Sequence, residues 1–243
     1  MKAVFHSGVS GLMAYQQALD TVGNNVANVN TVGYKTQSSN FDDLLYTQMN
    51  TKSAPELLRG RGVKVAATQL HAEQGSLIPT GIKLDFAVLG DGFFMVDNAG
   101  SQEFTRNGAF AIGIRSRRNY LTTTDGAYVL DLRGRKIELT TDAATGLINY
   151  DDLAGRIGVY RFANPHALNP LSSTRYQATE ESGAQARDTK GVCEVKSGYL
   201  EQSGTKLEDQ MTNLITAQRA YQVSARVLQT GDEIEEIVNG LRR

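Results

Sequence analysis

The sequence predicts an α+β fold in which helices at the two ends of the chain pair with each other as a coiled coil around a central all-β domain of sandwich or barrel type. Apolar residues near both termini recur at alternating steps of three and four, which keeps one narrow helix face apolar. From Val63 onward the apolar period changes to two, as in a strand with one buried face. Turn residues then separate short apolar runs about every ten residues, which is typical of a sandwich or barrel.

The N-terminal helix is predicted to begin near Ser7 or Ser10, since either hydroxyl could cap it, and to end at about Ala27. Its apolar seam consists of Leu12, Tyr15, Leu19, Val22, Val26 and Val29. A helix with such a seam packs against one or more other helices.

A defined turn is expected to follow this helix. Asparagine is a poor residue in a helix interior and tolerates left-handed backbone, and glycine adopts that backbone without a steric penalty. The residues that indicate the turn are Asn24, Asn25, Asn28, Asn30 and Gly33, and it ends at Gly33-Tyr34-Lys35. After it, apolar residues between Phe41 and Met49 predict a second short helix or an ordered strap, and residues 51–62 read as a loop.

The C-terminal helix has a capping-box signal, Thr205 with Glu208, at its start. Running on to Leu241 it would be about 55 Å long at 1.5 Å per residue. Its first seam consists of Leu207, Met211, Leu214, Gln218, Tyr221, Ala225 and Leu228. A second seam, one residue out of phase, consists of Val227, Thr230, Ile234, Ile237 and Leu241. Two seams exceed what one shorter N-terminal helix can cover, so the surplus apolar face is expected to meet other molecules.

The central region is predicted to hold a hairpin of residues 84–89 and 93–96 about the turn Gly90-Asp91-Gly92. Further strands are expected at residues 103–105, 109–112, 120–122, 127–130, 136–139 and 158–162. Residues 165–191, rich in turn formers, are expected to form a surface excursion. The predicted domains are therefore a terminal helical core (1–34 and 200–243), a linker strap (35–62) and a central β-domain (63–199).

Composition argues against several functions. The net charge of −1 with mixed signs gives no reason to expect nucleic acid or an anionic membrane as a partner. The short basic run Arg115, Arg117 and Arg118 is interpreted as a solvated loop. No apolar stretch approaches the ~20 residues that span a bilayer, and we expect no cleaved signal peptide. Cys193 is the one cysteine, so no internal disulfide is available.

Catalytic, cofactor and metal sites are not expected. His6, His71 and His166 lack any ligand spacing, and the segment around Asp91 lacks the residues of a phosphate or calcium loop. Neighbouring carboxylates such as Glu235 and Glu236 point apart on a helix and make no acid–base pair. No nucleophile elbow is present. The chain is thus predicted not to be an enzyme.

Several segments resemble the signatures of the bacterial flagellar rod and hook protein family. Near the N-terminus these are SGLMAYQQAL (10–19), NNVAN (24–28) and TVGYK (31–35). In the centre they are GSL (75–77), LDFAV (84–88), GDGFF (90–94), FTRNGAF (104–110) and DG (125–126). Near the C-terminus they are GYLE (198–201) and AQRAY (217–221). The segments occur in the family's order and cover nearly the whole chain.

This resemblance implies an axial structural subunit of the basal-body rod, most similar to the distal rod protein. It implies export unfolded by the flagellar type III apparatus without a cleaved signal peptide. It also implies helical stacking with copies of itself and with neighbouring rod and hook proteins, through an inner tube of terminal helices. The assembly interface is predicted at Leu12, Leu19, Val22, Val26, Leu207, Met211, Leu214, Tyr221, Leu228 and Ile234. Arg106 and Arg219 have two open roles, an internal salt bridge or a contact with the next subunit.

The alternative from another class is a soluble or secreted β-rich binding module whose helices form a closed stalk. A hydrolase on the β-scaffold is a third hypothesis, but the sequence contains no set of catalytic residues that supports it.

Overall fold

The computed structural model describes residues 2–48, 58–115, 117–140, 150, 153–172, 174–188 and 191–241. They fall into two compact units. Unit 1 comprises Met1–Ala27, Gln37–Gln69 and Lys206–Arg243, and unit 2 comprises Asn28–Thr36 and Leu70–Thr205. The chain is α+β, with a helix near each terminus and a β-rich centre, as predicted.

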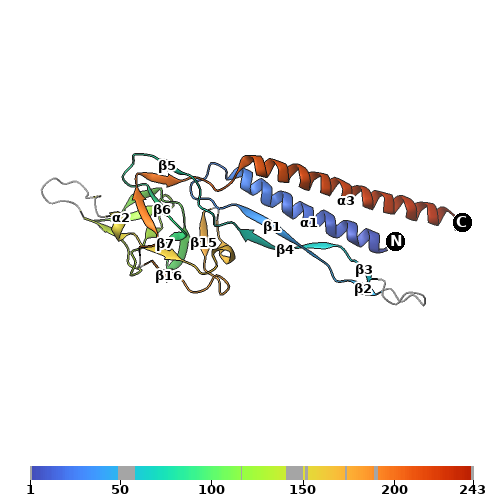
Figure 1. Cartoon of the computed structure of the whole chain (residues 1–243), viewed down its shortest axis with the longest axis horizontal. Helices are drawn as coiled ribbons and strands as arrows, with labels where there is room; N and C mark the ends of the chain where they lie inside the picture. Colours follow the sequence, from blue (N-terminus) through green and yellow to red (C-terminus); the bar gives the residue numbers. More distant parts are fainter. Residues whose placement is uncertain are drawn as a thin grey trace. The chain divides into compact units, whose positions relative to one another are not determined.

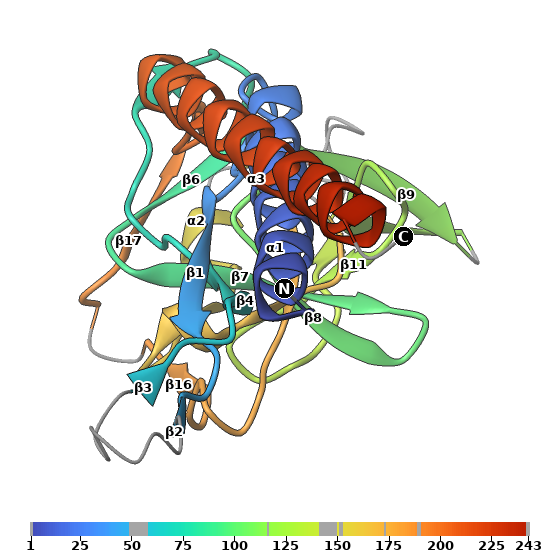
Figure 2. The same ribbon diagram turned by 90° about the vertical axis from the view of Figure 1, so that its right-hand side faces the viewer.

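Unit 1 contains the two long helices, α1 (Lys2–Ala27) and α3 (Leu207–Leu241), which lie side by side (Figure 1). Viewed from their free ends, α3 crosses over α1 (Figure 2). The unit also contains a two-stranded ribbon of β1 (Gln37–Asp43) and β4 (Val63–Leu70). A second short ribbon pairs β2 (Thr47–Gln48) with β3 (Leu58–Arg59). Residues 37–43 and 47–48 are thus strand where a short helix or strap was expected from Phe41 to Met49, and residues 49–57 lie outside the described part.

α1 begins earlier than predicted, and α3 begins one residue later than an N-cap at Thr205 would give. α1 begins at Lys2, so Ser10 is interior, and its hydroxyl donates to the Ser7 carbonyl at 2.9 Å. α3 begins at Leu207, and the Lys206 carbonyl accepts the first-turn N–H of Gln210 at 3.1 Å. The Thr205 hydroxyl lies 3.1 Å from the Thr36 hydroxyl, with which it forms a hydrogen bond.

Unit 2 is built on a ten-stranded sheet whose main path is β12-β10-β11-β7-β8-β15-β14. The bounds are β7 Gly92–Asn98, β8 Ser101–Thr105, β10 Arg118–Thr123, β11 Tyr128–Val129, β12 Glu138–Leu139, β14 Asn169–Pro170 and β15 Arg175–Gln177. Off this path, β9 (Phe110–Arg115) pairs with β10, and β13 (Val159–Arg161) pairs with β7 and β16 (Ala186–Arg187). The short helices α2 (Leu153–Arg156) and η1 (Pro165–Ala167) lie between strands in the sequence.

Strand β7 separates the two buried clusters of unit 2. Phe94 and Val96 belong to one cluster, whereas Phe93 and Met95 belong to the other. Because successive strand side chains point to opposite faces, an uninterrupted apolar run is required here. The run at residues 93–96 therefore marks the centre of the β-rich core.

Two predictions for the central region were wrong. The strand β6 (Phe86–Leu89) pairs with β17 (Glu194–Ser197), and not with β7 across Gly90-Asp91-Gly92. Residues 165–191 are not an excursion, since β15 joins the sheet and Leu168 and Tyr176 are buried in its core. Both errors concern pairings between residues far apart in the sequence, which local turn signals do not determine.

Another small sheet pairs β5 (Leu77–Pro79) with β18 (Tyr199–Glu201). The basic run forms the tip of the β9–β10 hairpin, where Arg118 pairs with Glu138 at 2.8 Å and Arg115 donates to the Tyr128 hydroxyl at 3.0 Å. The helices of the described ranges include no candidate for a membrane span.

Candidate assembly surfaces and a buried charge cluster

The face of α1 that meets α3 is made of small residues. The buried positions of α1 are Gly8, Gly11, Ala14, Ala18, Val22 and Asn25, which recur every three or four residues. A Cβ placed on Gly8 would lie 2.9 Å from Leu228 Cδ2, and one on Gly11 would lie 3.1 Å from Ser224 Oγ. Small side chains therefore allow the two helices to approach closely. Of these six positions, the predicted apolar seam included Val22 alone.

Facing positions identify the helix pair as antiparallel. Gly8 meets Leu228, Gly11 meets Ser224, and the Asn25 amide donates to Gln210 Oε1 at 3.0 Å. At 1.5 Å per residue on both helices, Lys2 lies opposite about residue 233 of α3. The last two turns of α3, residues 234–241, thus extend past the first described residue of α1, and Figure 1 shows this overhang beyond the N label.

The predicted assembly residues divide into two groups. Val22 is buried, and Leu12, Leu19, Val26, Leu214 and Leu228 are half-buried within unit 1. By contrast, Leu207, Met211, Tyr221 and Ile234 are exposed. The face of α3 toward α1 runs through Gln210, Leu214, Ala217, Ser224 and Leu228, so only Leu214 and Leu228 of the first predicted seam lie on it.

The second predicted seam of α3 is exposed in unit 1. Ile234, Ile237 and Leu241 are 46%, 62% and 83% exposed, and Val227 is 39% exposed. They lie about 100° or more around the helix from the row that meets α1. Val223 and Val238 add to this face. We call these six residues the outer seam: Val223, Val227, Ile234, Ile237, Val238 and Leu241.

The β1–β4 ribbon is tied to α1 by polar contacts. Asn25 donates to the Gln37 carbonyl at 2.7 Å and accepts the Gln37 N–H at 3.0 Å. The Val63 N–H donates to Ser10 Oγ at 3.3 Å. Between β1 and β2, Leu45 and Tyr46 are exposed and line a groove with Arg61 and Lys64.

Three of the five residues predicted to form the motif turn are buried, namely Asn25, Gly33 and Tyr34. Asn25 is buried by the contacts above, whereas Asn24 is exposed. Asn28 accepts both the N–H and the hydroxyl of Thr31 at 3.1 Å. Gly33 has φ +70°, and Tyr34 is buried. Burial raises the pKa of the Tyr34 phenol to about 12.

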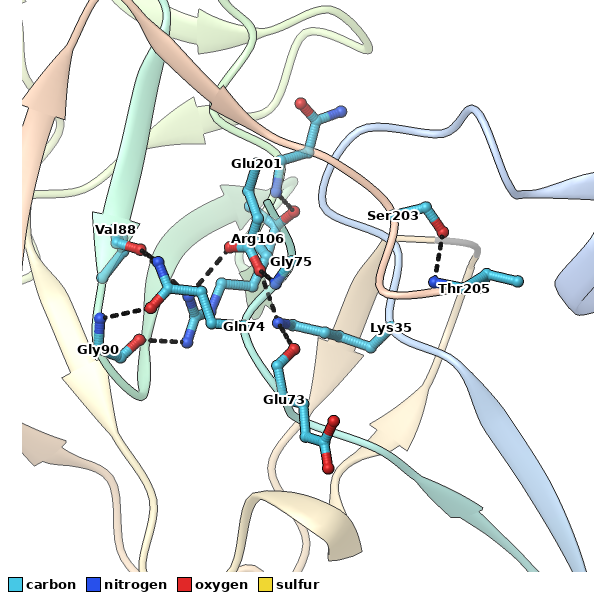
Figure 3. Close-up of polar contacts among 12 residues, drawn as sticks. Lys35, Glu73, Gln74, Gly75, Val88, Gly90, Arg106, Glu201, Ser203 and Thr205 are labelled. Carbon is cyan, nitrogen blue, oxygen red and sulfur yellow. Dashed lines mark hydrogen bonds and ion pairs between the residues drawn. The ribbon is translucent and has the colours of Figure 1, made fainter. Parts of the chain in front are cut away.

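A buried charge cluster lies within unit 2 where this turn ends (Figure 3). Its three members are Lys35, Arg106 and Glu201, each about 1% exposed. Glu201 Oε1 accepts Lys35 Nζ at 2.7 Å, and Oε2 accepts Arg106 Nη1 at 3.0 Å. Burial lowers the pKa of the Lys35 ammonium, and the neighbouring Glu201 carboxylate opposes that shift.

Further hydrogen bonds to backbone groups of Gly33, Glu73, Gly75 and Gly90 complete the cluster. Lys35 Nζ also donates to the Glu73 carbonyl at 2.5 Å, and Arg106 Nη2 donates to the Gly90 carbonyl at 2.6 Å. Glu201 Oε1 accepts the Gly75 N–H at 2.8 Å, and its backbone carbonyl accepts the Gly33 N–H at 2.8 Å. The guanidinium of Arg106 stacks over Phe93, 5.1 Å from the ring centroid.

The segments of unit 2 that continue into unit 1 are bonded to one another beside this cluster. The Thr36 carbonyl accepts the His71 N–H at 2.8 Å, and the Tyr34 carbonyl accepts the Gly204 N–H at 3.0 Å. Thr36 and Thr205 share a hydroxyl contact. Three chain segments, ending at Thr36, beginning at Leu70 and ending at Thr205, therefore meet at one place.

The open question about Arg106 is thus resolved in favour of an internal ion pair, although a buried one. Arg219 is exposed on α3, with Gln222 Oε1 3.5 Å from its Nη1. One sequence signal could have identified the cluster. Each of the motifs TVGYK (31–35), FTRNGAF (104–110) and GYLE (198–201) contains a single charged residue among uncharged ones. In the described ranges no group of three or more His, Cys, Asp or Glu is placed to hold a metal ion.

Three family models match the chain, in the order of the segments described above. The model "Flagella basal body rod protein" matches residues 5–35, and "Flagellar hook protein FlgE/F/G D1 domain" matches residues 87–152. The model "Flagellar basal body rod FlgEFG protein C-terminal" matches residues 196–241. Lys35, Arg106 and Glu201 fall one in each matched segment.

Full-length relatives are also similar to the chain. The flagellar basal-body rod protein FlgG of Borreliella burgdorferi is 33% identical, over 100% of this chain and 99% of its own length. FlgG of Agrobacterium fabrum is 34% identical over 95% of both chains, and FlgG of Bacillus subtilis is 33% identical over 96% of this chain and 97% of its own. The flagellar hook protein FlgE of Treponema pallidum is 39% identical over 46% of this chain and 26% of its own.

Proposed function

The chain belongs to the flagellar basal-body rod and hook protein family, and we propose that it builds the rod as a helical homopolymer through its terminal helices. Membership makes it a structural subunit of the flagellar basal body, most like FlgG, in a family of structural proteins and not of enzymes. Rod and hook proteins assemble with one another, so neighbouring members of this family are its partners.

The observation that carries the proposal is the outer seam on α3. Its six apolar side chains are exposed. Val223 and Val227 lie beside the row of α3 that α1 covers, whereas Ile234, Ile237, Val238 and Leu241 lie on the overhang beyond the first described residue of α1. Exposed apolar rows of this size are characteristic of interaction surfaces. A contact between two different faces of identical subunits that does not close into a ring generates an open helical filament. The outer seam supplies one such face.

In the assembled rod, we propose that α1 and α3 form a coiled-coil pair whose outer seam packs on the terminal helices of the next copy. The functional division of the chain would be helical core (1–34 and 200–243), strap (35–62) and outer β-domain (63–199). The subunit would leave the cell through the flagellar type III export apparatus without a cleaved signal peptide. The family membership supports each of these steps.

A double substitution in the outer seam tests the proposal. Ile234→Asp with Ile237→Asp should leave the helix content and melting temperature of the free chain unchanged, because both side chains are exposed. The variant should be absent from purified hook–basal bodies, because uncompensated carboxylates in an apolar helix contact cost several kcal/mol. The matched control is Gln229→Asp, an exposed position on the same helix that lies outside the seam.

Normal incorporation of the double variant would show that the outer seam is not the interface. Absence of the wild-type chain itself from hook–basal bodies would reject the rod and favour the binding module. The change Leu214→Asp with Leu228→Asp is a less specific test, since both residues lie on the row toward α1 and their loss would also separate the helix pair.

A further inference from the structure

We propose that Lys35, Arg106 and Glu201 form a clasp that positions, from within unit 2, the chain segments leading to both terminal helices. The clasp would be a positioning site for assembly. It would hold the segments 31–36 and 199–205 in the one arrangement from which α1 and α3 enter the rod. This inference rests on the proposed function, which it deepens.

The first step is the bonding of Glu201. Each of its carboxylate oxygens pairs with a different cation, and its backbone carbonyl accepts the N–H of Gly33, on the same segment as Lys35. No other side chain of the cluster bonds to both cations within the described residues. Loss of this one carboxylate would therefore release the N-terminal turn, the Arg106 segment and the C-terminal segment together.

The second step is the charge balance. Two cations and one carboxylate are buried at about 1% exposure, so the cluster carries one excess positive charge. A buried ion pair contributes little net stability compared with an apolar replacement, whereas removing one partner leaves an uncompensated charge. The substitutions are thus unequal. Lys35→Met leaves the neutral Arg106–Glu201 pair, but Glu201→Gln leaves two unpaired cations.

The third step is the location of the clasp beside the chain exits. Lys35 precedes Thr36, which bonds to both His71 and Thr205, and Glu201 lies on the segment whose Gly204 N–H binds Tyr34. Gly33 is held so closely that a Cβ there would lie 2.5 Å from the backbone of Arg106. The clasp and the adjoining segments 34–36 and 203–205 are linked by these hydrogen bonds. Loss of the clasp would therefore weaken the hydrogen bonds that hold those segments.

The fourth step is the origin of the three members. One comes from each of the three segments that match the rod and hook family models, and two of those segments contain the terminal helices. In sequence, Lys35 stands at the end of the N-terminal match and Glu201 near the start of the C-terminal match. The clasp is where the helical segments and the β-rich segment of the family are joined.

Amide hydrogen exchange on the free, full-length chain tests the clasp directly. Glu201→Gln should raise the exchange rates of the Gly33, Gly75 and Gly204 amides by roughly 100-fold, while amides of β7 change little. Adding Lys35→Met to Glu201→Gln should restore part of that protection, because it removes one of the two unpaired cations. The control is Glu194→Gln, an exposed carboxylate on the neighbouring strand β17.

The same variants are then scored for entry into hook–basal bodies, where Glu201→Gln should fall at least about tenfold below Glu194→Gln. Exchange in Glu201→Gln no faster than in Glu194→Gln would overturn the clasp, and so would wild-type incorporation of Glu201→Gln. If Glu201→Gln unfolds unit 2, Lys35→Met alone must still raise exchange at Gly33 and Gly204, and its failure to do so would overturn the inference. Absence of wild-type chain from the particles would reject the rod function and leave the exchange result standing.

Discussion

Gly33 is the residue at which backbone conformation and close packing act together. Its φ of +70° is unfavourable for side chains other than glycine by roughly 1–2 kcal/mol. A Cβ would also lie 2.5 Å from Arg106 C and from Asn107 N, and backbone atoms cannot move aside as a flexible side chain can. The motif turn therefore requires glycine for two independent reasons.

Gly33→Ala should lower the free energy of unfolding by about 3 kcal/mol or more, since strain and overlap add. Gly81→Ala is the matched control, because Gly81 has φ +71° and no atom within 4 Å of its Cβ position. We expect the control to lose only about 1 kcal/mol, the conformational part alone. Urea unfolding of the two variants measures the difference, and equal losses would show that Arg106 does not press on the turn.

Tyr34 gives the turn a dependence on alkaline pH. Its folded pKa of about 12 lies above the ordinary value of 10 for a tyrosine. The stabilising contribution is therefore complete below pH 10 and is lost as the pH rises toward about 12, where the unfolded chain has already released this proton. Tyr34→Phe removes the titrating group. It should flatten the fall in unfolding free energy between pH 10 and pH 12 by at most about 1.4 kcal/mol per pH unit. An unchanged slope in urea titrations at pH 9 to 11.5 would contradict this.

For single residues, the backbone conformation of the turn could be predicted from the sequence, but the partners of the buried charges could not. Asparagine and glycine indicate a turn by themselves, because both tolerate left-handed backbone. The partners of Lys35 and Arg106 could not be read in the same way, because Glu201 is 166 and 95 residues away from them. An ion pair of that separation exists only once the strands that carry it have been placed.

Among the elements, α1 illustrates how a helix can be recognised while its contact face is misjudged. Its four small facing residues include Gly8 and Gly11, each of which costs a helix about 1 kcal/mol relative to alanine. The close approach of Leu228 and Ser224 explains why that cost is tolerated. The large apolar residues of the predicted seam flank this contact, and periodicity alone gives them more weight than glycine.

Ala14→Leu should separate the helix pair, because Ala14 is 2% exposed and a larger side chain has no free volume to occupy. We expect a loss of about 1–3 kcal/mol in the stability of unit 1. The neighbouring Met13 is 64% exposed, so Met13→Leu should change stability by less than about 0.5 kcal/mol. Circular dichroism at 222 nm during urea unfolding reports both. If the two variants unfold alike, α1 does not contact α3 through its small residues.

For the strands too, positions could be predicted from the local sequence, whereas pairing partners far along the chain could not. The strands expected at residues 103–105, 109–112, 120–122, 127–130, 136–139 and 158–162 all correspond to strands β8 to β13, with shifted ends. Alternating and apolar runs are properties of the segment itself. The partner of β6 is not, because β17 lies about a hundred residues further along the chain. Element type was therefore predictable from the segments themselves, whereas the one pairing that was predicted, between residues 84–89 and 93–96, was wrong.

For the whole molecule, the two units differ in how much of their apolar surface is covered within one subunit. In α3 the buried residues are Gln210 and Ala217, whereas unit 2 encloses two large apolar clusters. Local stability follows the density of buried apolar contacts. Unit 1 of the free chain is therefore expected to be the less stable part, as an element that gains its remaining contacts on assembly should be.

Heating the free chain should consequently give two transitions. Helical signal at 222 nm is expected to fall first, by about 10 °C or more, and near-ultraviolet circular dichroism of tyrosine later. The second signal reports mainly unit 2, because seven of the ten tyrosines lie there and the chain has no tryptophan. In assembled rods the outer seam would be covered, so the helical transition should move up to or beyond the tyrosine transition. Coincident transitions in the free chain would mean that the helices are already as stable as the β-rich unit, and that their exposed seam gains no stability from a neighbour.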